Sequence, residues 1–152
     1  MGRPREERLD QLHRTEVRRP ATVLTLLLLA LSGCNGGTVD RHALKRDAEK
    51  VGSLASEGQL LANDVSRGAS TKSFARVHAH ELSRAASDLA DSLATRRTAV
   101  GIEARLRRLS KLAGKVSGEL EQLHLHPTDR VVAASLRQPL TKDADLADKL
   151  SK

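Results

Sequence analysis

The sequence predicts an all-α protein: an up-down antiparallel helical bundle of three long helices followed by a shorter, broken fourth. Three observations lead to this prediction. Beyond residue 39, apolar residues recur at spacings of three and four, and alternating strand patterns are almost missing. Short stretches with Gly, Pro, Ser and Thr separate the periodic segments. Because short connections make neighbouring helices antiparallel, the helices should alternate in direction.

The first predicted helix covers residues 40–67. Asp40 can cap its start, and Gly68 suits its end. Its apolar positions share one face: Leu44, Ala48, Val51, Ala55, Gly58, Ala62 and Val65. Small residues of this kind allow close helix approach, although each buries little surface.

The second predicted helix opens at Ser70 or Thr71 and runs to about Arg96. The residues predicted for its apolar face are Phe74, Val77, Leu82, Ala85, Ala86, Leu89 and Leu93. Phe74 is the only Phe, Tyr or Trp in the chain. This face is expected to pack against the rest of the bundle.

The third predicted helix, from about Val100 to His124, has the most regular pattern. Its seam is an uninterrupted four-three repeat: Ile102, Leu106, Leu109, Ala113, Val116, Leu120 and Leu123. A repeat of this kind lets helices pack side by side. Four glycines lie inside the predicted helices, and each is expected to cost roughly 1 kcal/mol relative to Ala. They are Gly52, Gly58, Gly114 and Gly118.

The fourth predicted helix is short and interrupted. Thr128 or Asp129 can cap its start, and it should continue to about Gln138. Pro139 is expected to kink or divide it, because proline lacks the amide hydrogen and clashes with the preceding turn. Thr141 can cap the remainder.

An apolar run precedes the bundle. It extends from Ala21 to Ser32, follows Arg18 and Arg19, and is followed by Cys34, the only cysteine. A positive flank, a short apolar run and small residues at a cleavage point are typical of an export signal. At 12 residues the run is shorter than the roughly 20 that a transmembrane helix needs. A buried core helix, an ordinary cleaved signal and a twin-arginine signal are the other interpretations.

The segment Leu31-Ser32-Gly33-Cys34 resembles the lipobox of bacterial lipoproteins, which is an aliphatic residue, two small residues and a cysteine. The resemblance covers roughly residues 18–35. It implies that the chain is cut before Cys34 and that a lipid is joined to the sulfur. Residues 1–33 are then a signal peptide, residues 34–39 a lipidated tether, and residues 40–152 the bundle domain.

Two details refine this interpretation. Residues 1–17 have mixed charge, which is unusual for the start of a signal and suggests a translation start near Val17. Asn35 does not resemble the Asp that retains lipoproteins at the inner membrane. We therefore expect an exported protein, lipid-anchored to the cell membrane, or to the outer membrane where the organism has two.

Charge and composition narrow the function. The 152-residue chain has a net charge of +7, which favours anionic partners. A single aromatic residue argues against single-stranded nucleic acid, whose binding needs several stacking platforms. Nucleophile-elbow, phosphate-loop and haem-attachment motifs do not occur, and lipidation would occupy the only thiol. We therefore predict a non-catalytic binding or structural module without a cofactor.

A basic cluster is the first candidate site. Arg107, Arg108, Lys111 and Lys115 are predicted to share the outer face of the third helix. Besides the membrane lipid carried by Cys34, we expect this face to contact an anionic lipid surface or an acidic cell-wall polymer. The alternative is an ordinary solvated helix surface.

Histidines give the second candidate, a metal-binding or storage bundle. His78 is predicted to face inward and His80 outward, and His124 to lie toward the same bundle end as His78. Glu81 and Glu121 each stand one turn from a histidine, in a pattern faintly similar to the Glu-x-x-His element of ferritin-like di-iron bundles. The alternative is a histidine at the bundle end that is hydrogen-bonded to a neighbouring glutamate.

Overall fold

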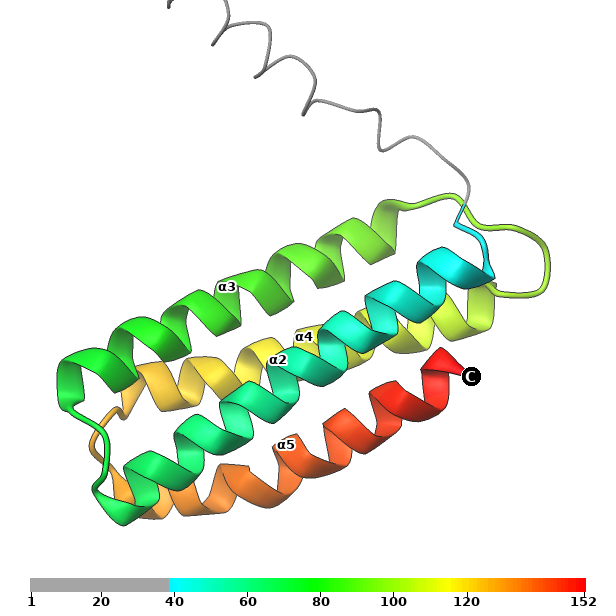
Figure 1. Cartoon of the computed structure of the whole chain (residues 1–152). Coiled ribbons are helices and arrows are strands. Elements are labelled where there is room, and N and C mark those ends of the chain that lie inside the picture. The colour runs from blue at the N-terminus through cyan, green and yellow to red at the C-terminus, as the bar shows by residue number, and fades with distance from the viewer. Residues whose placement is uncertain (1–38) are drawn as a thin grey trace, which may run out of the picture. The chain divides into compact units, whose positions relative to one another are not determined.

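A computed structural model describes residues 39–152, so the predicted signal peptide, Cys34 and residues 35–38 of the tether lie outside the described residues. Within this part the fold is an all-α bundle (Figure 1). Its four helices are α2 (Arg41–Arg67), α3 (Lys72–Thr95), α4 (Glu103–Leu125) and α5 (Arg130–Ser151). None of these helices is both apolar and long enough to cross a membrane.

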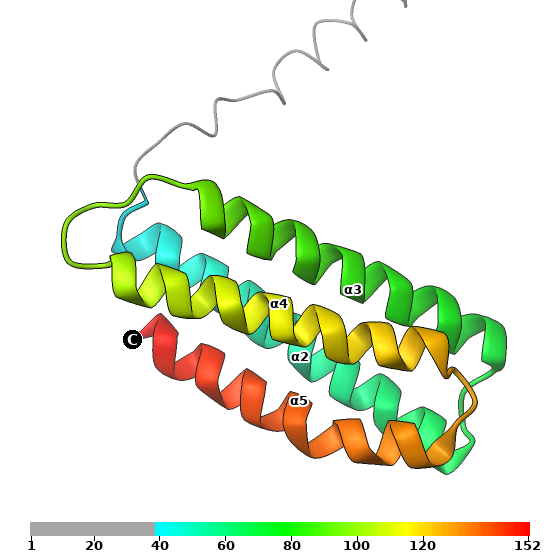
Figure 2. The same ribbon diagram turned by 180° about the vertical axis from the view of Figure 1, so that it is seen from behind.

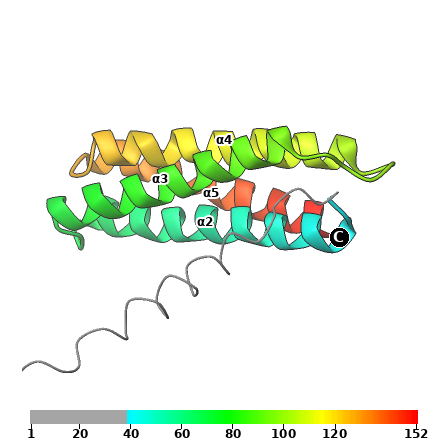
Figure 3. The ribbon, with the colours of Figure 1, turned by 90° about the horizontal axis from the view of Figure 1, so that it is seen from above.

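The helices associate as two pairs. α2 packs mainly against α5 and α3 mainly against α4, and fewer contacts join one pair to the other. The four helices lie along a common direction, as the view from above shows (Figure 3). The turns 68–71 and 126–129 lie at one end, here called the turn end (Figures 1 and 2). The loop 96–102 and the C-terminus lie at the opposite end, here called the loop end.

The predicted helix boundaries are confirmed at most ends. The Asp40 carboxylate accepts a hydrogen bond of 2.7 Å from the Ala43 amide and caps α2, and this bond lowers the pKa of Asp40. Gly68 adopts the left-handed conformation, at φ 71°, that ends a helix most readily in glycine. Thr71 and Asp129 cap α3 and α5 through their side chains.

The seam predicted for the third helix is confirmed, because all seven of its residues are buried, six of them in α4 and Ile102 at its N-cap. The helix itself begins at Glu103, later than predicted. Val100 is 98% exposed in the loop, and Gly101 has a φ of 94°. That left-handed residue reverses the chain before α4, so the helix cannot extend back to Val100.

The predicted apolar face of the second helix is partly wrong. Phe74 and Val77 are 57% and 61% exposed, whereas Ala75 and Ala79 are completely buried. Leu82, Ala86 and Leu93 are buried as predicted, so the difference is largest in the first turns of the helix. Placing alanines at the contact lets α3 approach α4 closely, and the bulky Phe74 would not fit there.

The predicted division of the fourth helix at Pro139 and its predicted shortness are also wrong. α5 is one continuous helix of 22 residues that contains Pro139, and it is nearly as long as the 23-residue α4. Proline removes one backbone hydrogen bond, but packing compensates, because Leu140 is fully buried in the core. Thr141 is not a cap, since its hydroxyl donates to the Arg137 carbonyl within the helix at 2.9 Å.

Candidate functional site

Three of the four predicted basic residues form an exposed cationic surface on α4. Arg107, Arg108 and Lys111 all lie in its first half, toward the loop end, and all are exposed. None of them forms an ion pair with another residue between 39 and 152. Their charges are therefore available to an external anion.

Lys115 does not belong to this surface, which corrects the prediction. Its ammonium lies 2.6 and 2.7 Å from the two carboxylate oxygens of Asp143 and 3.1 Å from Glu119. Partial burial opposes the charged form of Lys115, but these hydrogen bonds outweigh it and raise the lysine pKa. Asp143 is only 4% exposed, so Lys115 neutralises a buried carboxylate and links α4 to α5.

Glu119 completes this group with a second carboxylate. Burial, assisted by the negative charge of Asp143, raises the pKa of Glu119 even though Lys115 acts in the opposite direction. Its Oε2 atom is buried without a hydrogen-bond partner in the described part of the chain. The contact between α4 and α5 therefore contains an acid whose charged form is disfavoured.

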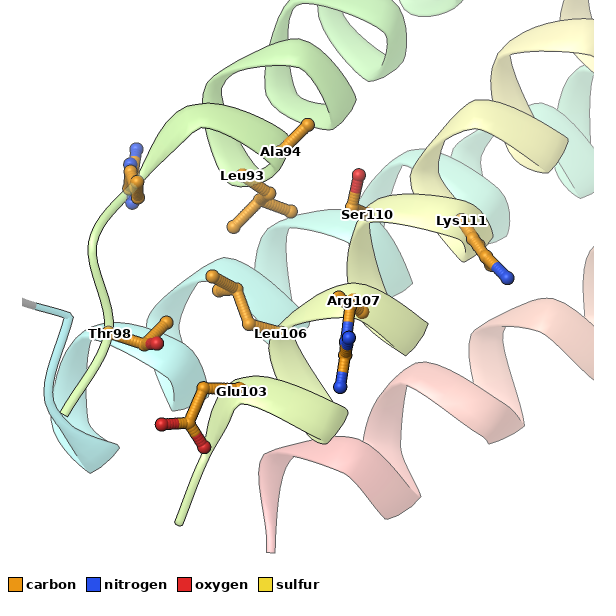
Figure 4. A pocket seen from close by; sticks show the side chains of 9 residues that line it. Leu93, Ala94, Thr98, Glu103, Leu106, Arg107, Ser110 and Lys111 are labelled. Carbon is orange, nitrogen blue, oxygen red and sulfur yellow. The ribbon is translucent and has the colours of Figure 1, made fainter. Parts of the chain in front are cut away.

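A crevice of about 260 Å³ opens between α3 and α4 at the loop end (Figure 4). Leu93 and Leu106 point toward one another across it, and Thr98 in the loop points toward Leu106. Arg107 and Lys111 stand one helical turn apart at its edge and carry their charged ends outward from α4. Leu93 and Leu106 are themselves buried, with 1% and 4% of their surfaces exposed, so the crevice offers little apolar surface beside its cationic edge.

The other charged residues around the crevice already have partners. Arg96 donates to Asp47 at 2.7 Å and to the Ser92 hydroxyl at 2.8 Å. The Glu103 carboxylate accepts a hydrogen bond of 3.0 Å from the Gly101 amide. Because these groups satisfy one another or the backbone, Arg107 and Lys111 are the cations left for a ligand at this edge.

The chain enters the bundle beside this crevice. The Val39 amide donates to the Arg97 carbonyl at 2.9 Å, and the Val39 carbonyl accepts from the Ala99 amide at 3.2 Å. Val39 is also buried, with 3% of its surface exposed. These contacts attach the first described residue to the loop that contains Thr98, so the chain segment that leads back toward Cys34 starts at the loop end.

The histidines pair differently from the prediction. His124 stacks obliquely on His80, with ring centroids 4.8 Å apart, and its Nδ1 lies 2.9 Å from the Arg76 carbonyl. His78 instead contacts Glu57 on α2 at 3.0 Å. Ala79, which lies between the two histidines in sequence, is buried, so His78 and His80 flank the packed face on opposite sides, His78 toward α2 and His80 toward α4.

The acidic residues of the predicted metal set do not join these rings. Glu81 is exposed, and Glu121 accepts a hydrogen bond of 3.4 Å from Ser83. In residues 39–152 no three His, Cys, Asp or Glu side chains are grouped so that they could hold a metal ion. The set His78, Glu81, Glu121 and His124 is therefore not assembled, and no observation favours the metal-binding function.

A second hollow, of about 710 Å³, lies between α2 and α3 and has Leu54, Ala85 and Leu89 in its wall. Its rim has both signs of charge, including Lys50 and Asp88. Neither the crevice nor this hollow is predicted by the sequence. The contact between α2 and α3 is small. The one sequence signal that could have indicated this is the irregular spacing of apolar residues along α3.

Comparison with family models, with curated proteins and with solved structures finds no match to this chain. Its function is therefore inferred from its own residues.

Proposed function

We propose that this protein is a lipid-anchored, non-catalytic binding or structural module of the cell envelope, whose loop end contacts an anionic surface. The observation that carries the proposal is the position of three exposed cations, Arg107, Arg108 and Lys111, on the half of α4 nearest the loop end, where none of them pairs with a residue between 39 and 152. The chain enters the bundle at that end. The alternating course of the helices in Figure 1 supports the up-down antiparallel arrangement that the sequence predicts.

The proposed anchor would hold this end close to the membrane. Only residues 35–38 separate Cys34 from Val39. Five extended residue steps reach about 16–18 Å. At physiological ionic strength the Debye length is about 8 Å, so cations on the loop end can come within range of the head groups. The proposed location is the cell membrane, or the outer membrane in an organism with two, because Asn35 follows the cysteine.

The expected attraction is weak for each residue but sufficient for a tethered module. A Lys or Arg close to an anionic membrane contributes about 1 kcal/mol. Arg107, Arg108 and Lys111 together give about 3 kcal/mol, which corresponds to roughly a hundredfold change in an equilibrium constant. Because the tether already raises the local concentration, this attraction is enough to set the orientation of the bundle. An acidic cell-wall polymer would supply the same chemistry, and nucleic acid is not the proposed partner.

The anchor is tested by intact-mass spectrometry of the protein purified from its native membrane. We expect a chain that begins at Cys34 and carries several acyl groups, because a single chain gives only marginal attachment. Cys34→Ser should leave the precursor uncut. A wild-type chain that is cut elsewhere and carries no lipid would overturn the anchor.

The anionic contact is tested with residues 36–152, which form a compact unit. This unit should bind anionic vesicles weakly, bind neutral vesicles hardly at all, and lose binding at high salt. The variant Arg107→Glu/Arg108→Glu/Lys111→Glu leaves Lys115 intact and should abolish binding.

A matched control reverses the same number of charges at the turn end. Arg67, Lys72 and Arg76 are exposed and form no ion pair among residues 39–152. Their triple change to Glu alters net charge equally and should weaken binding much less. If the two variants bind alike, only net charge matters and the assignment of the contact to the loop end fails.

A further inference from the structure

We propose that the face formed by α2 and α3 is a self-association surface, on which a second copy of this chain docks as a symmetric dimer. The two-fold axis would run along the helices, so that α2 of each copy covers α3 of the other. The pairing does not rest on lipidation of Cys34, and it goes beyond the proposed contact with an anionic surface.

Large apolar side chains are exposed on this face in the half nearest the turn end. Phe74 and Val77 of α3 are 57% and 61% exposed, and Leu60 of α2 is 61% exposed. Phe74 stacks on His78, with ring centroids 5.2 Å apart, and His78 contacts Glu57 of α2 at 3.0 Å. Phe74 and Leu60 each lie one helical turn from a residue of this contact, on either side of it. Exposed apolar side chains that gather on one face mark an interaction site.

The hollow of about 710 Å³ between α2 and α3 adds apolar surface to the same face toward the loop end. Its apolar wall is accessible, because Leu54 and Leu89 are only partly buried and Ala85 is exposed. α2 and α3 have little contact with one another, so neither helix covers these residues of the other. A second copy docked on this face would cover them together with the three large side chains near the turn end.

The charges around the hollow favour one orientation of the second copy. Lys50 on α2 and Asp88 on α3 line the same hollow, so they lie at similar heights along the bundle. The Lys50 side chain is 68% exposed, and Asp88 is exposed. Arg46 and Glu49, the other charged residues of the rim, are both on α2 and offset one another. The α2 side is therefore positive and the α3 side negative.

A two-fold axis along the helices makes these two sides complementary. It places Lys50 of each copy opposite Asp88 of the other, because the same surface meets itself with its two sides exchanged. An axis across the helices would instead place Lys50 opposite Lys50 and Asp88 opposite Asp88, and like charges at an interface oppose association. The charge pattern therefore selects the first arrangement.

The size of the face and the position of the chain entry agree with this dimer. α2 has 27 residues and α3 has 24. Two such helices, at about 1.5 Å per residue and about 10 Å across, present roughly 700 Å², close to the roughly 800 Å² that each partner contributes to a standard interface. The same axis puts both loop ends on one side of the dimer, so the chain enters both copies from that side at Val39.

The experiment is sedimentation equilibrium of the full chain in a neutral detergent whose density is matched by the solvent, so that only protein contributes to the measured mass. We expect the mass of two chains at high protein concentration and the mass of one chain on dilution. Circular dichroism checks that every variant retains its helical content.

The orientation is tested by reversing one charge on each side of the hollow. Lys50→Glu or Asp88→Lys alone places like charges opposite each other in both cross-chain pairs, and should weaken the dimer at least tenfold. An equal mixture of the two variants should dimerise as tightly as the wild type, because each pair then joins opposite charges. The controls Lys142→Glu and Asp145→Lys make the same changes at exposed positions of α5, and should alter dissociation less than twofold.

The face itself is tested with Ala85→Glu, which places an unpaired charge at the centre of the interface and should abolish the dimer. Ala85 is exposed in the single chain, so the fold should survive. Ala134→Glu makes the same change at an exposed position of α5 and should leave the dimer intact.

Three results would each overturn the proposal. The first is a wild-type chain that keeps the mass of one copy at every concentration, which would leave the face to a different protein. The second is a pair of charge variants that dimerise like the wild type alone, or fail to dimerise when mixed. The third is an equal effect of Ala85→Glu and Ala134→Glu. Failure of the membrane contact would be seen separately, because vesicle binding is tested at Arg107, Arg108 and Lys111 of α4.

Discussion

Gly58 lies where α2 approaches α4 and α5 closely, and its replacement by Ala gives a sharp test of the packing. A Cβ atom at this position would lie well inside van der Waals contact with the Leu120 Cδ2 atom of α4 and 3.5 Å from Leu140 Cδ1 of α5. Leu120 and Leu140 are both completely buried, so neither can move aside freely. Gly58 is therefore required for α2 to reach both helices.

The net effect can be estimated from two opposing contributions. Gly→Ala inside a helix gains about 1 kcal/mol from helix propensity. Overpacking a closed core costs about 1–3 kcal/mol. We therefore expect Gly58→Ala to lower the free energy of unfolding by up to about 2 kcal/mol, contrary to the sequence expectation that all four helical glycines are simply unfavourable.

The matched controls are Gly114→Ala and Gly118→Ala, because a Cβ atom at either position meets no atom within 4 Å. Each should raise stability by about 1 kcal/mol. Urea unfolding of residues 36–152, followed by circular dichroism, measures all three variants under the same conditions. If Gly58→Ala stabilises the protein as much as Gly114→Ala does, the close contact between α2 and α4 is wrong.

Three further predictions concern the polar groups. Lys115→Ala leaves Asp143 buried without its partner, a change that typically lowers the free energy of unfolding by about 3–5 kcal/mol. Because Lys115 is half exposed, we expect a loss of about 3 kcal/mol. An unchanged urea midpoint would refute the pairing. Burial raises the pKa of Glu119 in the folded protein above its unfolded value, so the contribution of Glu119 to stability is greatest in acid and is lost as pH rises through the folded pKa. Glu119→Gln should remove this decline from melting temperatures measured between pH 4 and 8. Zinc titrated into the full chain should show no stoichiometric site, and a site abolished by His80→Ala and His124→Ala would restore the metal-binding hypothesis.

The fold could be predicted from sequence where large side chains determine the packed face. The regular four-three spacing of apolar residues in the third helix predicts one seam, and all of its residues are buried, together with Leu112 beside them. In α3 the same reasoning favoured Phe74 and Val77, because bulky apolar residues normally lie inside. The structure buries Ala75 and Ala79 instead, since close packing against α4 selects small residues. The packed face of α3 therefore depends on how closely α4 approaches it, which the side chains of α3 alone do not reveal.

The contacts between helices at the candidate sites could not be predicted from the residue pattern of a single helix. The wheel of α4 places Lys115 on its outer face, but it cannot show that Asp143 of α5 lies within hydrogen-bond distance. The pairing of His80 with His124 likewise depends on the rotation and axial offset of two helices. The crevice needs the geometry of the loop as well, because Thr98 forms part of its lining.

The measurement that tests the central proposal most directly is the distance of each bundle end from the head groups of an anionic membrane. Spin labels at Val100→Cys, in the loop end, and Ala69→Cys, in the turn end, report this distance through relaxation by a paramagnetic lipid head group. Val100 is 98% exposed and Ala69 is exposed, so both positions accept a label without disturbing the core.

With the membrane-anchored chain, we predict much stronger relaxation at residue 100 than at residue 69 on anionic lipid. Arg107→Glu/Arg108→Glu/Lys111→Glu should reduce the relaxation at residue 100, and the matched reversal of Arg67, Lys72 and Arg76 should leave it nearly unchanged. Equal relaxation at the two ends, or no response to the α4 reversal, would contradict the proposed contact between the loop end and the membrane.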